Sequence, residues 1–235
     1  MGGFVNDIET NEVTQSLNSS LIGSTESQIT SSANSIIMGS VSSSIRYSNI
    51  STIIGGLSNQ ILHSSSLLPS NIVGSGIIGG TNNIINALPS LDSQSKIANT
   101  YIYGGSGNDI LANLPNGTSL HSIINGTILG GINNHIVNGL SPVVIGGFSN
   151  TVSANNGTII NGSGCHVSHS TSCIIGKTNF TTTAENTLYV SNIDVSGTGS
   201  FGRLETTVIS SSIIYSSGSN IFGDSLADGD THTFY

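Results

Sequence analysis

Charged residues are scarce in this chain, and that scarcity already excludes some functions. Lys, Arg, Asp and Glu make up 7% of the 235 residues, with 4 basic side chains against 12 acidic ones and a net charge of −8. Nucleic-acid binding depends on clusters of basic side chains, so this composition argues against a nucleic-acid partner.

Long apolar runs and large aromatic rings are also missing. No apolar run approaches ~20 residues, so no membrane-spanning helix is expected. Residues 1–16 lack the basic segment and the apolar core of a signal peptide. Trp is absent and aromatic residues make up 5%, which weakens the case for a sugar site built on ring stacking. A bound glycan would instead be contacted mainly by polar side chains such as Asn and Ser.

What the chain does contain is glycine, 30 residues of it, arranged in a short repeat. The clearest copy is Thr52–Ile61, and the first Gly of each copy serves as an anchor. The anchors are Gly23, Gly39, Gly55, Gly79, Gly104, Gly130, Gly146, Gly162 and Gly176. They are separated by 16, 16, 24, 25, 26, 16, 16 and 14 residues, and a fixed short period of this kind predicts a solenoid.

The column two residues before each anchor is aliphatic throughout and indicates the fold class. It contains Leu21, Ile37, Ile53, Ile77, Ile102, Ile128, Val144, Ile160 and Ile174. β-Branched side chains favour strands over helices. We therefore predict an all-β fold: a parallel β-roll or β-helix solenoid of about nine 16-residue coils, each with two short strands. Three of these coils carry insertions. Strand spacing of ~4.8 Å gives a stack roughly 40 Å long.

A column of asparagines lies four residues after five successive anchors, at Asn59, Asn83, Asn108, Asn134 and Asn150. One interpretation is a ladder of side-chain amides that bond from coil to coil. The other is the ordinary preference of Asn for turns. The spacing alone does not separate the two.

The column one residue before each anchor is apolar as well, although neighbouring strand residues point to opposite faces. A lone solenoid would therefore expose a long apolar stripe, and such stripes are normally covered by a partner. We predict that this column forms the interface of a homotrimer. The candidate interface residues are Ile22, Met38, Ile54, Ile78, Tyr103, Leu129, Ile145 and Ile175.

The three long coils are consecutive, and each insertion contains a Leu-Pro pair. Their loops are expected to stack into one ridge, which either faces a receptor or clamps neighbouring protomers. The candidate receptor-facing residues are Ser64, Leu68, Pro69, Leu88, Pro89, Asp92, Leu114, Pro115 and Asn116.

Side chains that could carry chemistry are few. A glycosidase needs paired carboxylates, and residues 17–183 hold only Glu26, Asp92 and Asp109, so we predict no enzymatic activity and no catalytic residue. Cys165 and Cys173 could be reduced structural thiols, form a disulfide, or bind an ion together with nearby histidines. The first of these is preferred, with no metal and no cofactor.

The predicted domains are a polar lead-in over 1–16, the solenoid over 17–183 and a C-terminal β fibre connector over 184–235, expected to continue into a longer chain. The repeat pattern Ile-Ile-Gly-Gly-x-x-Asn-x-Ile resembles the heads of trimeric autotransporter adhesins, which are trimers of left-handed parallel β-rolls. Its Asn and Ile columns depart from the small residues usual in those heads.

The C-terminal segments at 189–202, 218–225 and 230–234 resemble segments of viral and phage tail fibres. That resemblance implies a homotrimeric virion fibre on the virion surface, with other virion proteins and a host-surface glycan or receptor as partners. The alternatives are an extracellular adhesin head on a bacterial cell surface and a solenoid tailspike that degrades glycans.

Overall fold

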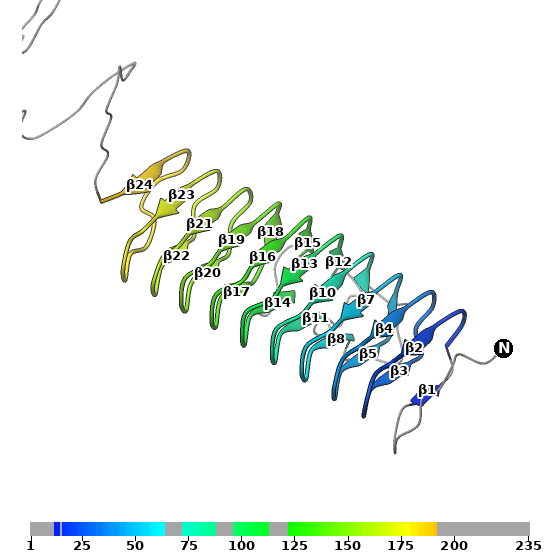
Figure 1. Cartoon of the computed structure of the whole chain (residues 1–235). Helices are drawn as coiled ribbons and strands as arrows, with labels where there is room; N and C mark the ends of the chain where they lie inside the picture. The colour runs from blue at the N-terminus through cyan, green and yellow to red at the C-terminus, as the bar shows by residue number, and fades with distance from the viewer. Residues whose placement is uncertain (1–11, 15, 64–71, 88–95, 113–121, 192–235) are drawn as a thin grey trace, which may run out of the picture. The chain divides into compact units, whose positions relative to one another are not determined.

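The chain forms a stack of β coils, seen in a computed structural model that describes residues 12–14, 16–63, 72–87, 96–112 and 122–191. Figure 1 shows the coils lying on one another with their strands side by side. Every pairing between strands is parallel, and the described segments contain no helix, hence none that could cross a membrane. The predicted parallel β-solenoid is thus confirmed.

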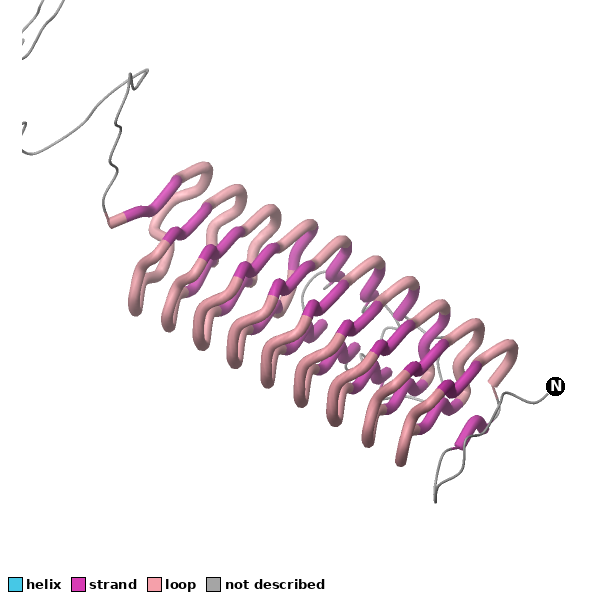
Figure 2. The backbone as a smooth tube through the Cα atoms, viewed as in Figure 1, coloured by secondary structure: helices cyan, strands magenta, loops and turns pink. Residues whose placement is uncertain are grey.

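Three parallel sheets, here named A, B and C, line the coils (Figure 2). Sheet A contains β1 (Glu12–Thr14), β3 (Gln28–Thr30), β5 (Ser44–Arg46), β8 (Gln60–His63), β11 (Ile84–Ala87), β14 (Asp109–Ala112), β17 (His135–Ile136), β20 (Thr151–Val152) and β22 (His166–Val167). Sheet B contains β6 (Ser48–Asn49), β9 (Ile72–Val73), β12 (Lys96–Ala98), β15 (Ser122–Ile124) and β18 (Gly139–Leu140). Sheet C contains β2 (Ser20–Ile22), β4 (Ile36–Met38), β7 (Thr52–Ile54), β10 (Gly76–Ile78), β13 (Tyr101–Tyr103), β16 (Thr127–Leu129), β19 (Val143–Ile145), β21 (Thr158–Ile160), β23 (Cys173–Ile175) and β24 (Leu188–Val190).

Sheet B corrects the prediction of two strands per coil. Ile72 of sheet B pairs in register with Ser48 of the preceding coil and with Ile97 of the next. All three side chains point inward and are fully buried. The long coils therefore bury an isoleucine in sheet B where the short coil before them has Ser48 and the short coil after them has Gly139.

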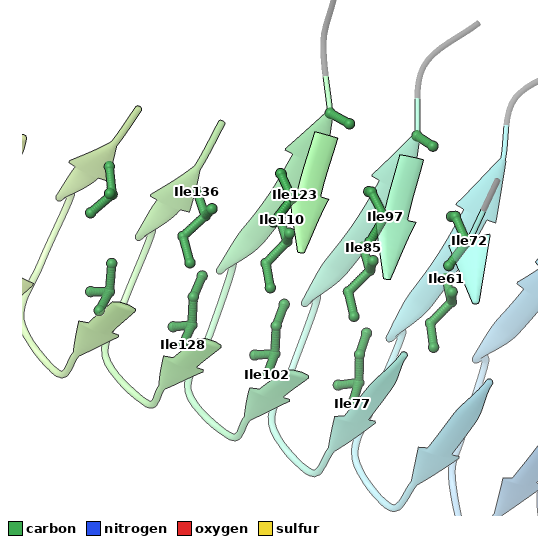
Figure 3. Packing of buried hydrophobic residues seen from close by; sticks show 14 of the residues in the cluster. Ile61, Ile72, Ile77, Ile85, Ile97, Ile102, Ile110, Ile123, Ile128 and Ile136 are labelled. Carbon is green, nitrogen blue, oxygen red and sulfur yellow. The ribbon is translucent and has the colours of Figure 1, made fainter. Parts of the chain in front are cut away.

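The core consists of isoleucine columns that run along the stack (Figure 3). Ile53, Ile77 and Ile102 occupy one column in sheet C, and Ile61, Ile85 and Ile110 occupy the facing column in sheet A. All six are 0% exposed. Full burial of such a side chain stabilises the fold by about 1.5–3 kcal/mol, so the columns are the main source of its stability.

The register of one later coil, the one predicted to be anchored at Gly162, differs from the predicted register by a residue. Ile159, not Ile160, pairs with Val144 and lies in the core, while Ile160 pairs with Ile145 on the outside. Asn161 takes the place of the anchor glycine with a φ of 50°. Asn tolerates this left-handed conformation better than most residues, so Gly162 is the second residue of the turn and this coil has 15 residues.

The stack extends past both of the predicted solenoid boundaries. β1 pairs with β3 ahead of residue 17, and β24 pairs with β23 beyond residue 183. Phe180 and Tyr189 pack on the last layer of the core, with ring centroids 5.0 Å apart. The rest of the predicted fibre connector, from residue 192 on, lies outside the described residues.

Candidate interaction surface

The predicted interface column lies on the outer face of sheet C and is solvent-exposed. Ile22, at 44%, is its most exposed apolar member, and Ile145 and Ile175, at 37%, are the least exposed of those predicted. With Ile160 added by the corrected register, this outer row is Ile22, Met38, Ile54, Ile78, Tyr103, Leu129, Ile145, Ile160 and Ile175. The exposure predicted for the row is confirmed, whereas the partner chain stays a prediction.

A second row runs beside the outer row, on the other side of the glycine turn. One residue per coil, two places after the anchor, pairs in parallel with its equivalent in the next coil. This turn row is Thr25, Val41, Leu57, Thr81, Ser106, Ile132, Phe148, Ser163 and Thr178. Its apolar members are exposed by 42% to 51%. Sequence reasoning missed it, although four large apolar residues at one repeat position were a usable signal.

The glycine turn between the two rows is shaped by the asparagine column. Gly55 and Gly56 have φ values of 66° and 87°, a region that favours glycine. A Cβ added at Gly55 would meet nothing, but one at Gly56 would lie 2.3 Å from Nδ2 of Asn59 and 2.4 Å from the Gly80 oxygen. The second glycine therefore makes room for the asparagine amide.

The amide-ladder interpretation is confirmed. The backbone N–H of Asn83 donates to Oδ1 of Asn59 at 3.1 Å, and Nδ2 of Asn108 donates to Oδ1 of Asn83 at 3.2 Å. Nδ2 of Asn59 also donates to the Gly79 oxygen at 3.2 Å. All five asparagines are 0% exposed, so the ladder satisfies buried backbone groups at the corner that carries both rows.

The two N-terminal coils build the same corner from serines. Ser40 and Ser43 stand where the next coil has Gly56 and Asn59, and the backbone N–H of Asn59 donates to Oγ of Ser43. Ser24 and Ser27 form the equivalent pair one coil earlier. In these two coils a smaller inward side chain accompanies a larger residue in the turn, as expected if a Cβ at the second turn position excludes an asparagine amide.

The two cysteines occupy different sides of the solenoid and form no disulfide. Cys165 continues the asparagine column into the core, where its Sγ donates to the Lys177 oxygen at 3.1 Å. Cys173 is partly exposed in sheet C, where partial burial raises the pKa of its thiol. Within the described segments, no three His, Cys, Asp or Glu side chains are grouped so that they could hold a metal ion.

Among the described residues, the polar face of sheet A contains one ion pair, between His135 and Asp109. Nδ1 of His135 contacts Oδ1 of Asp109 on the neighbouring coil, and this hydrogen bond raises the pKa of His135. Oγ of Ser153 lies 2.8 Å from Nε2 of a different histidine, His166. Serine, histidine and aspartate are therefore not joined into one relay, the arrangement that a serine nucleophile requires.

All nine predicted receptor-facing residues lie in 64–71, 88–95 and 113–121, outside the described residues. The residues that flank these insertions are described. His63, Ala87 and Ala112, the last residues of β8, β11 and β14, pair in register before the insertions. The strands that follow the insertions, β9, β12 and β15, are neighbours in sheet B. All three insertions thus leave from one corner on consecutive coils, as predicted.

Comparison with known proteins does not assign a family. No protein-family model and no curated protein matches the chain. Among solved structures, the polySia-specific acetyltransferase NeuO aligns over 80% of this chain and 90% of its own, at 14% identity and a TM-score of 0.22. A TM-score this low supports no conclusion about fold or activity.

Proposed function

We propose that this chain is a non-enzymatic structural part of a homotrimeric fibre or spike of a virus or phage. In this proposal it holds out, or itself forms, a surface that attaches to host glycan or another host receptor. The observation that carries it is the uncharged double row of exposed side chains along sheet C. The outer row and the turn row together hold twelve of the seventeen exposed large hydrophobic side chains of the described residues.

The chemistry of the walls supports a structural role. Ser, Thr, Asn and Gly form most of the turns, and the ionisable pair at Asp109 and His135 is not joined to a nucleophile. The three insertions leave from one corner of a rigid scaffold, a placement typical of binding loops. In a trimer each loop would be displayed three times, so weak contacts would add up through avidity.

Two measurements test the proposal. Light scattering of the purified chain at low micromolar concentration should give about three times the chain mass of 24.0 kDa. A well-folded monomer would rule out the fibre. Shortening the three insertions to plain 16-residue coils should then leave a folded trimer that no longer binds host cells. A variant in which each insertion is replaced by a Gly-Ser loop of equal length is the control: it shows whether binding depends on the sequence of the loops or only on their length.

The shortened protein also decides between the two roles considered for the insertions. Dissociation into monomers would mean that the Leu-Pro loops clamp the protomers together. A folded trimer with undiminished binding would place recognition elsewhere in the chain. A bacterial adhesin head is the second candidate, on the strength of the repeat pattern, and an outer-membrane anchor in the same polypeptide would favour it.

A further inference from the structure

We infer that the two apolar rows pair with each other between copies of this chain: the outer row of one protomer packs, in register, on the turn row of the next. This inference rests on the proposed homotrimer and specifies its contact. The occupant of the apolar face is thus a second copy of the chain, in parallel orientation.

The amount of exposed apolar surface fits a contact between copies. A fully buried apolar side chain removes on the order of 100 Å² from water, so twelve such side chains at about 40% exposure leave on the order of 500 Å². An isolated patch on a monomer is usually no larger than a few hundred Å². In the proposed ring the outer row contributes roughly 300 Å² to one interface and the turn row roughly 200 Å² to the other. The backbone and the polar side chains beside the rows must supply the rest of the about 800 Å² that each partner buries in a specific interface.

The position of the rows favours pairing between unlike rows. They lie on the two sides of one turn, such as Gly55-Gly56, and run parallel along the whole stack. When such a corner points at a threefold axis, one side faces one neighbour and the other side faces the other neighbour. Each interface then joins an outer row to a turn row, a heterologous contact that closes into a ring.

Side-chain size supports the register. The outer row is bulky at every coil, and its largest member is Tyr103, exposed by 42%. In the same coil the turn row has its smallest type of residue, Ser106, whereas its largest residue, Phe148, belongs to the coil of Ile145. If outer rows met each other on the axis, three Tyr103 rings would converge. In the unlike pairing, each ring instead lies over a serine.

Chemistry also favours identical copies over a charged partner. Neither row contains a charged residue over nine coils, so stacking two copies in parallel brings no like charges together. A shift of one coil would place Tyr103 against Ile132 or Thr81, and Phe148 against Leu129 or Ile160. Thr81 is nearly as small as Ser106, so the size pattern disfavours only the shift that places Tyr103 against Ile132, and cross-linking decides between the two remaining registers.

Cysteine cross-linking between differently tagged chains tests this inference. In a Cys173→Ser background, Ile54→Cys in one chain is co-expressed with Leu57→Cys in the other. Oxidation should give covalent dimers of the two different chains. Ile54→Cys with Ile132→Cys, three coils away, is the matched control and should give none, since a disulfide needs Cβ atoms about 4 Å apart.

The results separate this inference from the proposed trimer. Covalent dimers from Ile54→Cys alone would mean that outer rows meet each other, which overturns the unlike pairing. Stronger cross-linking of Ile54→Cys to Val41→Cys or Thr81→Cys than to Leu57→Cys would overturn the register. A trimer mass with no cross-link at any of these positions refutes the inference but leaves the trimer intact, whereas a monomer mass refutes both.

A second variant tests the size match without cysteines. Ser106→Phe should reduce the trimer fraction at a fixed micromolar concentration at least tenfold, because the new ring fills the space assigned to the partner's tyrosine. Adding Tyr103→Ala to the same chain should restore most of the trimer. If the double variant dissociates as much as Ser106→Phe alone, the two positions do not face each other between copies.

Discussion

The side chain of Asn150 donates a hydrogen bond from Nδ2 to Oδ1 of Asn134 on the preceding coil at 3.0 Å, inside a fully buried column. The backbone N–H of Asn150 donates to the same oxygen at 3.1 Å. One amide oxygen therefore satisfies two buried donors, and the glycine carbonyls of the turn accept from the amide nitrogen of Asn134.

Replacing Asn134 with Ala should lower the free energy of unfolding by about 2–4 kcal/mol, because it leaves buried donors and carbonyls unpaired. Asn133→Gly is the matched control, since Asn133 is exposed and its φ of 53° suits glycine. Chemical denaturation followed by circular dichroism measures both variants. Equal stability of the two variants would mean that the ladder contributes nothing.

The corrected register of the coil that contains Ile159 and Ile160 is testable with these two neighbouring residues. Ile159→Ala should cost about 2–5 kcal/mol of unfolding free energy because it leaves a cavity in the core. Ile160→Ala, on the outer face, should cost much less in the monomer but weaken self-association. If Ile160→Ala proves the more destabilising of the two in denaturant, Ile160 belongs to the core after all.

The coupling between turn and ladder predicts a rescue. Gly56→Ser alone should strongly destabilise the fold, because its Cβ would contact the Asn59 amide and the Gly80 carbonyl. Adding Asn59→Ser recreates the corner that Ser40 and Ser43 form in the coil before it. The double variant should therefore melt at a higher temperature than Gly56→Ser, and strictly additive losses would argue against the coupling.

The pair formed by His135 and Asp109 should make stability weakly dependent on pH. The pKa of His135 is raised above its ordinary value of 6.5, so protonated His135 is favoured in the folded chain. The stabilisation from this shift is fully present below pH 6.5 and is lost as pH rises through the raised pKa of His135.

Because the two side chains are exposed by 41% and 28%, solvent screening limits the effect to about 1 kcal/mol. Thermal melts of the wild type and of Asp109→Asn at pH 6 and pH 8 measure it. The wild type should lose its advantage over the variant between these values, by a few degrees at most. An unchanged difference would show that the pair does not titrate in this range.

The sequence by itself determined the solenoid, the inner columns, the place of the insertions and the exposure of the outer row. All of these follow from local rules: alternation along a strand, β-branched preference and a fixed period carried by residues such as Ile53 and Gly55. Because each coil repeats the same short pattern, the columns can be assigned from the sequence without knowing how the coils pack on one another.

Only the tertiary structure decided the features that depend on stacking. Asn161 and Gly162 both suit a left-handed turn residue, and the packing of Ile159 on Val144 selected between them. Sheet B arose because the long coils bury Ile72 where the preceding short coil buries Ser48. The turn row and the outer row form one surface because the glycine turn places them side by side. Which residues are neighbours across a turn depends on the backbone conformation of that turn, and the sequence alone does not give it.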